Sequence, residues 1–456
     1  MLHPKTTVSF LIYFVEMSVP ITVSGGFLVD NGTSLPVDPF GRVRTSNPLT
    51  MSQIMSSNLV STVNAKQPLD ITEFTQNGAT TTQNSTSSVV ELTCDDTGAN
   101  QLVVRQTRTY VPYQPGKGRL VFMTGLLETN GGVTGVTARI GVFDDQDVAG
   151  KRFGDGHFFQ LSGSTLAVVE RSTSKTGSQI DTVINQSNWN GDKLDGTGPS
   201  KFNIDVSKMQ IFWMDMEWLG AGAVRFGVVV NNTLIVCHTI SHAPNKLTTN
   251  YTRTAKLPIR YELRNTGTTD SATMKQSCAT IISEGGFVPQ GIQFSLPTTQ
   301  RYISGTATST LSSVFKIGLT DEGYGVRGTL LPTRIAVVST SKNPMYWALI
   351  YSYSVTGNGT DVSGWAKADA AHSIAKYSAT FGSYSSSPND VVIASDVLAE
   401  KSTSAFSVDY TQNFGGVYPL GGSYDGLTDV YTIVVRRVGN SNSDFVLSVS
   451  WNEIQQ

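Results

Sequence analysis

KMQIFWMDMEWLGAGAVRFGVVVNNTLIVCHTI, residues 208–240, predicts three consecutive strands of one antiparallel sheet. Along its first part, side chains on one face alternate with side chains on the other, which is the period of two that a strand produces. One face carries Phe212, Met214, Met216 and Trp218, and the other carries Ile211, Trp213, Asp215 and Glu217. Both faces are largely apolar, so we expect this sheet to lie between two layers, as in a β-sandwich.

Two turns separate the three predicted strands. The glycine-rich segment 220–222 reverses the chain, and Asn231-Asn232 is a pair that tolerates the positive φ angles of a tight hairpin. The second and third strands, 223–230 and 233–240, are rich in β-branched residues. If the hairpin loop is 231–232, Arg225 lies opposite His238 and Phe226 lies opposite Cys237.

The composition predicts a β-rich scaffold. The chain has 456 residues, enough for about two or three domains. Charged residues make up 15%, against about 25% in ordinary soluble domains, and 43 glycines accompany abundant Ser, Thr and Asn. This pattern favours an extracellular or particle-borne protein over a metabolic enzyme with many surface helices.

Charge and cysteine content exclude several classes of protein. A net charge of -2 gives no overall attraction to nucleic acid or to an anionic membrane. Three cysteines, Cys94, Cys237 and Cys278, are too few and too widely spaced for a disulfide framework or a zinc site. The hydrophobic run 8–15 is too short to span a bilayer. It makes a poor signal peptide, and Met17 offers an alternative start, so whether residues 1–16 belong to the functional protein stays open.

We expect an extended N-terminal arm over residues 1–50, a β-sandwich or jelly-roll-like main domain over 51–290, and a second β-rich domain over 291–456. The polar segment 172–200 predicts a long surface excursion, and the Ala- and Lys-containing segment 365–378 predicts one helix. The expected strands of the main domain are 87–93, 102–111, 119–127, 136–143, 157–161, 165–171, 211–219, 224–230, 233–240, 258–264 and 278–283. Those of the second domain are 314–319, 333–339, 345–355, 391–398, 405–409, 430–437 and 445–451.

Asp215 and Glu217 are the candidate catalytic pair. They share one face of a strand, with Cα atoms roughly 6.5–7 Å apart, and glycosidases use carboxyl pairs about 5–9.5 Å apart. MDMEW keeps only part of the E-x-D-x-x-E pattern of laminarinase-like sandwiches, because Phe212 and Trp213 stand where the upstream acid would be. The alternative is a structural pair, for example with Arg225.

Metal and cofactor sites are not expected. His238 and His242 share a strand face but lie about 13 Å apart, too far for one ion. The loop at 143–156 offers Asp144, Asp145 and Asp147 to calcium, but without the EF-hand spacing. The sequence also has no P-loop, dinucleotide fingerprint or nucleophile elbow.

Aromatic and arginine side chains in and near loops are the candidate binding residues. Such side chains supply sugar-stacking platforms or anchors of protein interfaces, or simply pack a large β core. The candidates are Trp189, Trp218, Tyr110, Tyr113 and Arg225, with Trp365 as a further loop aromatic.

Several sequence blocks resemble a group of virion structural proteins of tailed bacteriophages and large aquatic viruses. The opening segment is PVDPFGRVRTSNP at 36–48. The others are VRQTRTYVPYQPGKGRLVFMTG (104–125), ARIGVFDD (138–145), WNGDKLDGTG (189–198), DMEWLGAGAVRFG (215–227), LPIRYELRN (257–265) and SEGG (283–286). The likeness covers about residues 36–286 and implies a place on a particle, without catalytic residues to carry across.

We therefore expect a non-enzymatic structural component of a phage particle, without a cofactor. It would be a capsid- or tail-attached decoration, knob, fibre or spike subunit in the virion, assembled as a homo-oligomer, with a trimer favoured. Its expected partners are other virion proteins and possible host glycans, with no nucleic acid and no membrane span. The alternative is a glycan-binding or glycan-cleaving host-recognition protein that uses Asp215, Glu217 and the nearby tryptophans.

Overall fold

The structure, a computed structural model, is all-β, as the sequence predicts. It describes residues 29–30, 33–34, 52–56, 66, 69–95, 100–108, 110, 113–146, 153–267, 270–283, 291–297, 301–303, 310–320, 328–340, 342–353, 365–407, 419–439 and 442–454. The chain divides into two compact units, residues 1–45 and 46–456. In the smaller unit the described part is a short hairpin of β1 (Val29–Asp30) and β2 (Thr33–Ser34).

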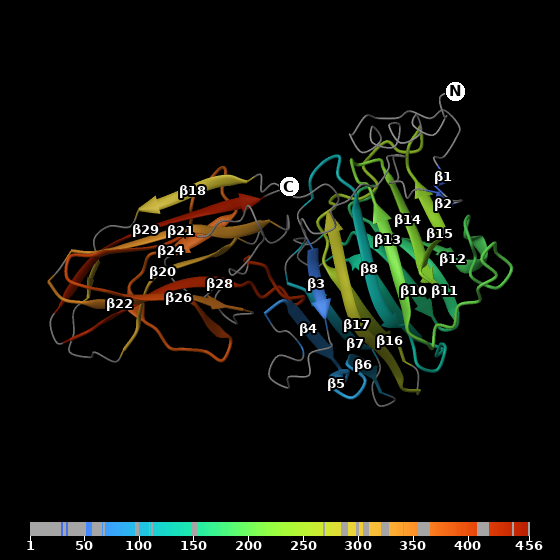
Figure 1. Ribbon diagram of the computed structural model, residues 1–456, viewed down its shortest axis with the longest axis horizontal. Coiled ribbons are helices and arrows are strands. Elements are labelled where there is room, and N and C mark those ends of the chain that lie inside the picture. The colour runs from blue at the N-terminus through green and yellow to red at the C-terminus, as the bar shows by residue number, and fades with distance from the viewer. Residues whose placement is uncertain are drawn as a thin grey trace, which may run out of the picture. The chain divides into compact units, whose positions relative to one another are not determined.

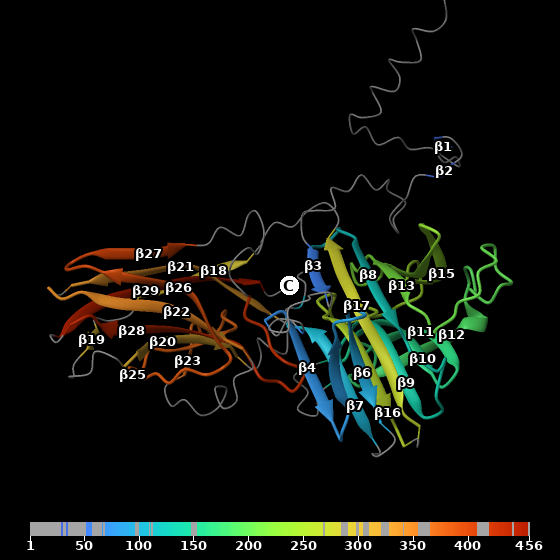
Figure 2. The same cartoon turned by 60° about the horizontal axis from the view of Figure 1, so that its bottom comes forward.

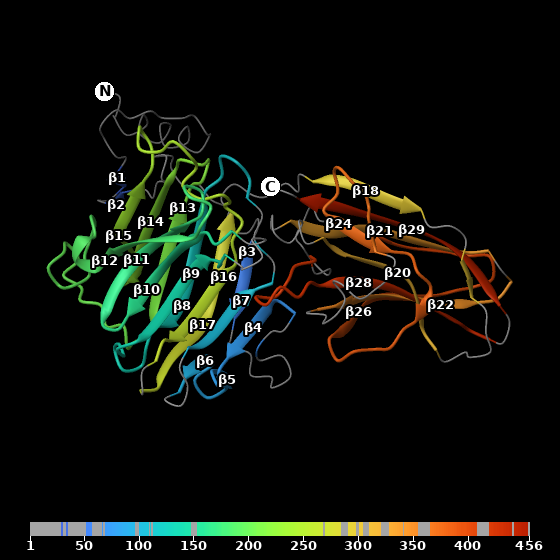
Figure 3. The same cartoon turned by 180° about the vertical axis from the view of Figure 1, so that it is seen from behind.

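Two antiparallel sheets build a first sandwich from the strands up to Ser283 (Figures 1 and 3). Sheet I has the order β15-β14-β13-β8-β17-β6-β5, and β3 also pairs with β17. Its strands are β3 (Ser52–Ser56), β5 (Thr80–Asn84), β6 (Val89–Cys94), β8 (Arg119–Leu126), β13 (Gln210–Met216), β14 (Ala223–Val230), β15 (Thr233–Ser241) and β17 (Ala272–Ser283). Sheet II has the order β12-β11-β10-β9-β16-β7-β4. Its strands are β4 (Ile71–Gln76), β7 (Gln101–Thr107), β9 (Val136–Phe143), β10 (Gly156–Ser162), β11 (Thr165–Ser172), β12 (Ile180–Asn185) and β16 (Ile259–Asn265).

The strand alternation read from residues 211–218 decides which side chains lie between the two sheets. Phe212 and Met214 of β13 are fully buried in the first hydrophobic core. Phe159 of β10, in sheet II, meets Phe212 with ring centroids 4.9 Å apart, so aromatic side chains interlock across the sandwich. Trp213 and Asp215 point to the other side of sheet I, as the period of two requires.

The predicted meander is present, with one correction to its register. Asn231 and Asn232 form the hairpin turn with φ of 50° and 61°, the left-handed conformation that a tight primed turn needs. Arg225 lies opposite Thr239 and Phe226 opposite His238, so the predicted partners were wrong by one residue. The reason is a β-bulge between Phe226 and Gly227, which adds one residue to β15 and shifts the pairing beyond it.

Segment 172–200 is more structured than the predicted surface excursion. It contains β12, the short 3-10 helix η1 (Gln186–Asn188) and a loop whose Trp189 and Leu194 are buried in the core. Asn190 lies against the outer edge of β15, where its side chain donates to the carbonyl oxygen of Thr239 at 2.9 Å and accepts from the Thr239 N–H at 2.8 Å. A Cβ on Gly191 would lie 2.5 Å from the Val236 carbonyl oxygen, so this close approach requires glycine.

A second sandwich follows, built from sheets III and IV, which Figure 2 shows as two layers. Sheet III has the order β18-β29-β21-β27, with β19 also paired to β29: β18 (Ile292–Pro297), β19 (Arg301–Ile303), β21 (Thr329–Ser339), β27 (Thr403–Ser407) and β29 (Ser443–Ile454). Sheet IV has the order β23-β24-β20-β28-β22-β26, with β25 also paired to β20. Its strands are β20 (Ser312–Leu319), β22 (Met345–Ser352), β23 (Ala366–Lys367), β24 (Ala375–Ser378), β25 (Gly382–Ser383), β26 (Asp390–Leu398) and β28 (Val430–Arg437).

The helix predicted over 365–378 was wrong. This segment forms β23, a turn and β24, which pair with each other and, through β24, with β20. Ile374 and Ala375 are buried in the second core, and burial on a sheet outweighs the weak helix propensity of alanine and lysine. Within the described residues no helix has the length and hydropathy to cross a membrane.

Candidate functional site

Asp215, the first carboxylate of the predicted pair, is held in an ion pair. It lies opposite Arg225 in the β13–β14 ladder, and its Oδ2 accepts a hydrogen bond from Arg225 Nε at 2.9 Å and a second from Nη2. Asp215 is fully buried, and the side chain of Arg225 is 20% exposed. Because Arg225 makes both of these hydrogen bonds, the Asp215 carboxylate serves an internal ion pair.

Glu217, the second carboxylate, follows the end of β13 and is also buried. Its backbone carbonyl lies 3.5 Å from the hydroxyl of Tyr251, and its N–H donates to the carbonyl oxygen of Ala223 at 3.1 Å. Glu217 thus sits where the glycine turn leaves the sheet, and a Cβ on Gly222 would lie 1.8 Å from its carbonyl oxygen.

The structure brings two of the four candidate aromatic residues together. Tyr113 and Trp218 meet edge to face, with centroids 5.6 Å apart, and the Tyr113 hydroxyl accepts from the N–H of Leu219 at 3.2 Å. Trp189 is buried and donates its indole N–H to the carbonyl oxygen of Ile184 at 3.1 Å, and Tyr110 is also buried. Trp218 is the member of this set with a half-buried side chain.

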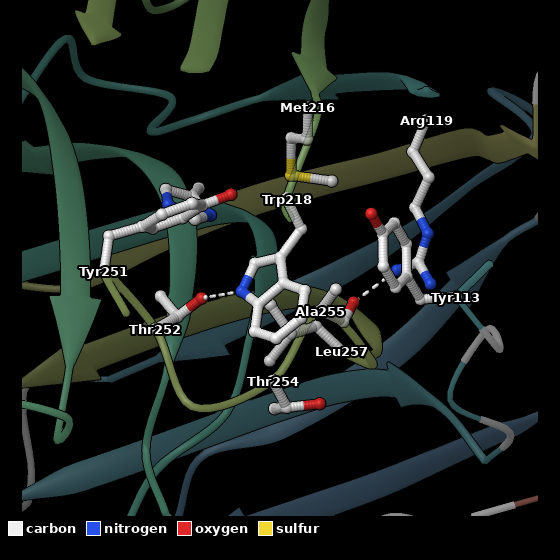
Figure 4. Close-up of a pocket in the computed structure, with 10 residues that line it drawn as sticks. Tyr113, Arg119, Met216, Trp218, Tyr251, Thr252, Thr254, Ala255 and Leu257 are labelled. Atoms are coloured by element: carbon white, nitrogen blue, oxygen red, sulfur yellow. Dashed lines mark hydrogen bonds between the residues drawn. The ribbon is translucent and has the colours of Figure 1, made fainter. Parts of the chain in front are cut away.

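A small cavity lies beside Trp218 (Figure 4). Its volume is about 10 Å³, which is room for about one water molecule. Trp218 donates its indole N–H to the Thr252 hydroxyl at 2.9 Å, a contact drawn in Figure 4. The lining residues come from sequence blocks 104–125, 215–227 and 257–265 and from segments between them: Tyr113, Arg119, His157, Met216, Trp218, Tyr251, Thr252, Thr254, Ala255 and Leu257.

A cluster of two histidines around one carboxylate adjoins this cavity. Glu170 of β11 and His157 of β10 are cross-strand partners in sheet II, and their Oε2 and Nε2 atoms are 3.4 Å apart. His242, which follows β15 of sheet I, places its Nε2 2.7 Å from the same oxygen. The ring of His242 stacks parallel on Tyr251, with centroids 4.0 Å apart. We call His157, Glu170, His242 and Tyr251 the histidine corner.

The two imidazoles decide the ionisation of Glu170. Burial alone would raise the pKa of this carboxyl, but hydrogen bonds and charge from His157 and His242 outweigh it and lower the pKa to about 2. Burial raises the pKa of Tyr251 well above its ordinary value, so its hydroxyl stays protonated. The corner therefore presents an ionised carboxylate inside the sandwich.

Sequence reasoning singled out His242 but missed its partner Glu170. The available signal was its position in TLAVVE, because Leu166 and Val168 occupy the same face of β11 and are buried in the core. A carboxylate at the next position of that apolar face needs a buried partner. His238, the other histidine of the predicted pair, accepts instead a hydrogen bond at Nδ1 from the N–H of Asn190 at 3.1 Å.

The aspartates weighed as calcium ligands, and not expected to bind a metal, make other contacts. Asp145 pairs with Arg171 and, at 2.7 Å, with Arg260 Nη1. Asp144 accepts from the N–H of Asp155 at 3.1 Å, and Asp147 lies outside the described residues. Over the residues that the structure describes, no group of three His, Cys, Asp or Glu side chains is arranged to hold a metal ion. All three cysteines are free thiols.

Comparisons with known proteins give weak likenesses to β-sandwich proteins. No family model matches the chain, and no curated protein matches it in sequence. A legume lectin-like domain from Entamoeba histolytica is 11% identical and covers 46% of this chain and 89% of its own, with a TM-score of 0.27. An endo-1,3-beta-glucanase from Streptomyces sioyaensis is 12% identical, with coverages of 52% and 97% and a TM-score of 0.32. The lectin UEA-II is 7% identical, with coverages of 53% and 100% and a TM-score of 0.31. Identities and scores this low carry no conclusion about function.

Proposed function

We propose that this chain is a structural subunit of a virus particle whose work is done by protein–protein interfaces. The proposal rests on the resemblance of residues 36–286 to virion structural proteins of tailed bacteriophages and large aquatic viruses. It places the subunit on the capsid or tail, as a decoration, knob, fibre or spike, in a homo-oligomer with a trimer as the favoured state.

One observation supports a framework over an enzyme: three of the polar groups selected from the sequence for chemistry are used in internal contacts. Asp215 is bound to Arg225, His242 to Glu170, and Asp145 to Arg171 and Arg260. The cavity beside Trp218 has room for about one water molecule. A sugar or peptide substrate is far larger than that, so neither could be enclosed in this cavity.

The direct test is co-purification with particles. Virus particles from the source of the gene would be banded in a density gradient, and antibodies against this chain would locate it among the fractions. We expect the chain in the particle band, at a constant ratio to the major capsid protein and after a high-salt wash. Recovery only in the soluble fractions would overturn the proposal.

Oligomeric state is a separate measurement on the purified chain. Light scattering coupled to gel filtration is expected to give a mass that is an integer multiple of 49.1 kDa, with a trimer favoured. A monomer at all concentrations would contradict the homo-oligomer, although attachment to other virion proteins would remain testable on particles.

The second candidate is glycan binding, and the specific observation in its favour is Trp218. This indole is half-buried at the cavity beside Thr252 and Thr254, where an aromatic face and hydroxyl groups meet. A glycan array probed with the wild type and with Trp218→Ala separates the candidates, since a binding signal lost in the variant would favour glycan recognition. Hydrolysis of a host polysaccharide that is abolished in Glu217→Gln would favour cleavage.

A further inference from the structure

The ring of His242 lies between two hydrogen-bond acceptors. Its Nδ1 is 2.7 Å from the carbonyl oxygen of Gly222, and its Nε2 is 2.7 Å from Oε2 of Glu170. A backbone carbonyl can only accept, so Nδ1 carries a hydrogen. An N···O distance of 2.7 Å to a carboxylate is that of a charge-assisted hydrogen bond, so a proton also lies between Nε2 and Glu170.

Glu170 is therefore the ionised partner of an imidazolium. The neighbouring imidazoles lower the pKa of this carboxyl to about 2 despite its burial, so Glu170 is ionised. The two acceptor oxygens, each 2.7 Å from a ring nitrogen, place a hydrogen on both nitrogens of His242. His157 Nε2 lies 3.4 Å from the same carboxylate oxygen, a long and poorly aligned contact that still favours the ionised carboxylate.

This ion pair joins segments from both sheets of the first sandwich. Glu170 belongs to β11 of sheet II, His242 directly follows β15 of sheet I, and Gly222 ends the turn that precedes β14. Tyr251 completes the corner, because its backbone N–H donates to the Gly220 carbonyl at 2.9 Å while its ring covers His242. Loss of the proton would free the glycine turn and the segment after β15 together.

We propose that the proton shared by His242 and Glu170 is a pH-sensitive lock that holds the 219–222 turn and the 242–252 segment against sheet II. Deprotonation leaves one ring nitrogen of His242 with a lone pair 2.7 Å from an acceptor oxygen, either the Gly222 carbonyl or the Glu170 carboxylate, and that contact is repulsive. Protonation of Glu170 removes the charge that attracts the imidazolium. The lock is thus closed at intermediate pH and opens toward both extremes, independently of the virion proposal.

Protonation of Glu170 determines how the lock opens at low pH. The pKa of Glu170 is lowered in the folded state. Its contribution to the stability of the folded state is therefore fully present above the ordinary glutamate pKa of 4.5 and is lost as the pH falls toward about 2. Other ionisable groups face the corner from each packed element, and their titration has to be separated from that of the lock: His157, Glu217, Tyr113, Arg119 and Asp155.

Nitrogen NMR of the histidine rings tests the protonation state in the wild type. The chain has five histidines, so selective ¹⁵N labelling gives few signals, and single His→Gln variants assign them. We expect both ring nitrogens of His242 to show protonated shifts at pH 7. A neutral His242 at pH 7, with one unprotonated ring nitrogen, would overturn the proposal, and this readout needs no variant at Glu170.

Hydrogen exchange tests the opening. Amides of residues 219–224 and 242–252, corrected for intrinsic rates, are expected to be most protected near neutral pH and at least tenfold less protected toward pH 3 and pH 10. Amides of β29 in the second sandwich serve as the internal reference. Equal pH dependence in the corner and in β29 would overturn the lock.

Glu170→Gln removes the ionisable carboxylate and so tests the role of the shared proton. The glutamine amide can donate an N–H to Nε2 of neutral His242, so the contact persists without an ionisable partner. We expect this variant to fold and to lose the pH dependence of corner exchange. His238→Gln is the matched control, because His238 lies on β15, just before His242 in the chain, but bonds to Asn190. It is expected to keep the wild-type profile. A wild-type profile in Glu170→Gln would contradict the proposal.

Discussion

Charged side chains are buried very differently in the two sandwiches. In the first sandwich, many arginines, carboxylates and histidines are buried, among them Arg105, Arg119, Arg171, Arg260, Asp215, Glu217, Glu262, Glu170, His157 and His242. In the described part of the second sandwich, the corresponding set is Lys376, Asp429, Arg437 and Glu453. The second core is instead aromatic and aliphatic, with Trp347, Trp451, Phe445 and Tyr431 among its members.

This difference separates two sources of stability. A buried charge is tolerated only where a partner and hydrogen bonds replace its hydration, so each pair of the first sandwich fixes a local arrangement and depends on protonation. A core of apolar side chains depends on volume and packing and is insensitive to pH. The stability of the first sandwich should therefore depend on pH and on substitutions of charged residues. The stability of the second should depend mainly on the size of its core side chains.

The largest effect is expected from a cavity in the second core. Phe445 of β29 is fully buried, and Phe445→Ala should lower the free energy of unfolding by about 3–5 kcal/mol, because it removes apolar contacts and leaves a void. Denaturant titrations at pH 7 and pH 5 should give the same loss. Ser448→Ala, on the opposite face of the same strand, is the control and should change stability by less than about 0.5 kcal/mol.

A charge substitution in the first sandwich should cost about 2–4 kcal/mol and depend on pH. Burial alone would raise the pKa of Asp145, but the guanidinium groups of Arg260 and Arg171 lower it overall. The contribution of Asp145 is therefore present above the ordinary aspartate pKa of about 3.9 and is lost as the pH falls below it. Asp145→Asn should have a lower free energy of unfolding than the wild type at pH 7, and this difference should become smaller below pH 4.

The control is Phe445→Ala, whose loss of unfolding free energy relative to the wild type should not change over the same acid range. If the Asp145→Asn gap stayed constant while the wild type remained folded, ionisation of Asp145 would not contribute to stability. The distinction between the two sandwiches would then lose its electrostatic basis.

The sequence predicts most strands but not the contacts that organise the site. Alternation and turn residues located β13, β14 and β15, because a half-buried strand and a tight hairpin leave local signals. The bulge after Phe226 shifted the pairing and left no such signal. β12 was missed because it lies in the polar, glycine-rich segment 172–200 and has no alternation of buried and exposed residues: Ile180 and Val183 are both exposed.

The histidine corner depends on residues far apart in the chain. Glu170 and His242 are 72 positions apart, and nothing local to either residue indicates that sheets I and II bring them together. The Asp215–Arg225 pair was accessible from sequence because its two strands are joined by one short turn. Long-range pairing across a sandwich is where sequence patterns stop being informative.

A smaller loss, about 1–2 kcal/mol, is expected from Asn190→Ala. This side chain makes two hydrogen bonds to the backbone of Thr239 and covers the edge of β15. Amide exchange in β15 should accelerate in the variant, while exchange in β22 of the second sandwich should not change. Asn185→Ala, an exposed position of β12, is the control. Equal acceleration in β22 would mean that the loss is global and that Asn190 does not act as a local edge clamp.

The last prediction concerns the rates at which the cysteine thiols are labelled. These rates report on opening of the first sandwich without a change of its sequence. Burial raises the pKa of Cys94 to about 12 and also raises that of Cys237. The thiolate is the reactive form, so at pH 8 Cys94 should be labelled roughly a thousandfold more slowly than a free thiol. Cys278, which is partly exposed, should react first.

The labelling rates also test whether the Asn190 hydrogen bonds limit the local opening of β15. Asn190→Ala should accelerate labelling of Cys237, because β15 carries both Cys237 and the Thr239 backbone that Asn190 holds. The same substitution should leave the Cys94 rate within about twofold, since β6 is far from β15 in the order of sheet I. Mass spectrometry of quenched time points distinguishes the two thiols by peptide. Parallel acceleration of Cys94 and Cys237 would show that the first sandwich opens as one cooperative unit, and the proposed local role of the Asn190 clamp would then fail.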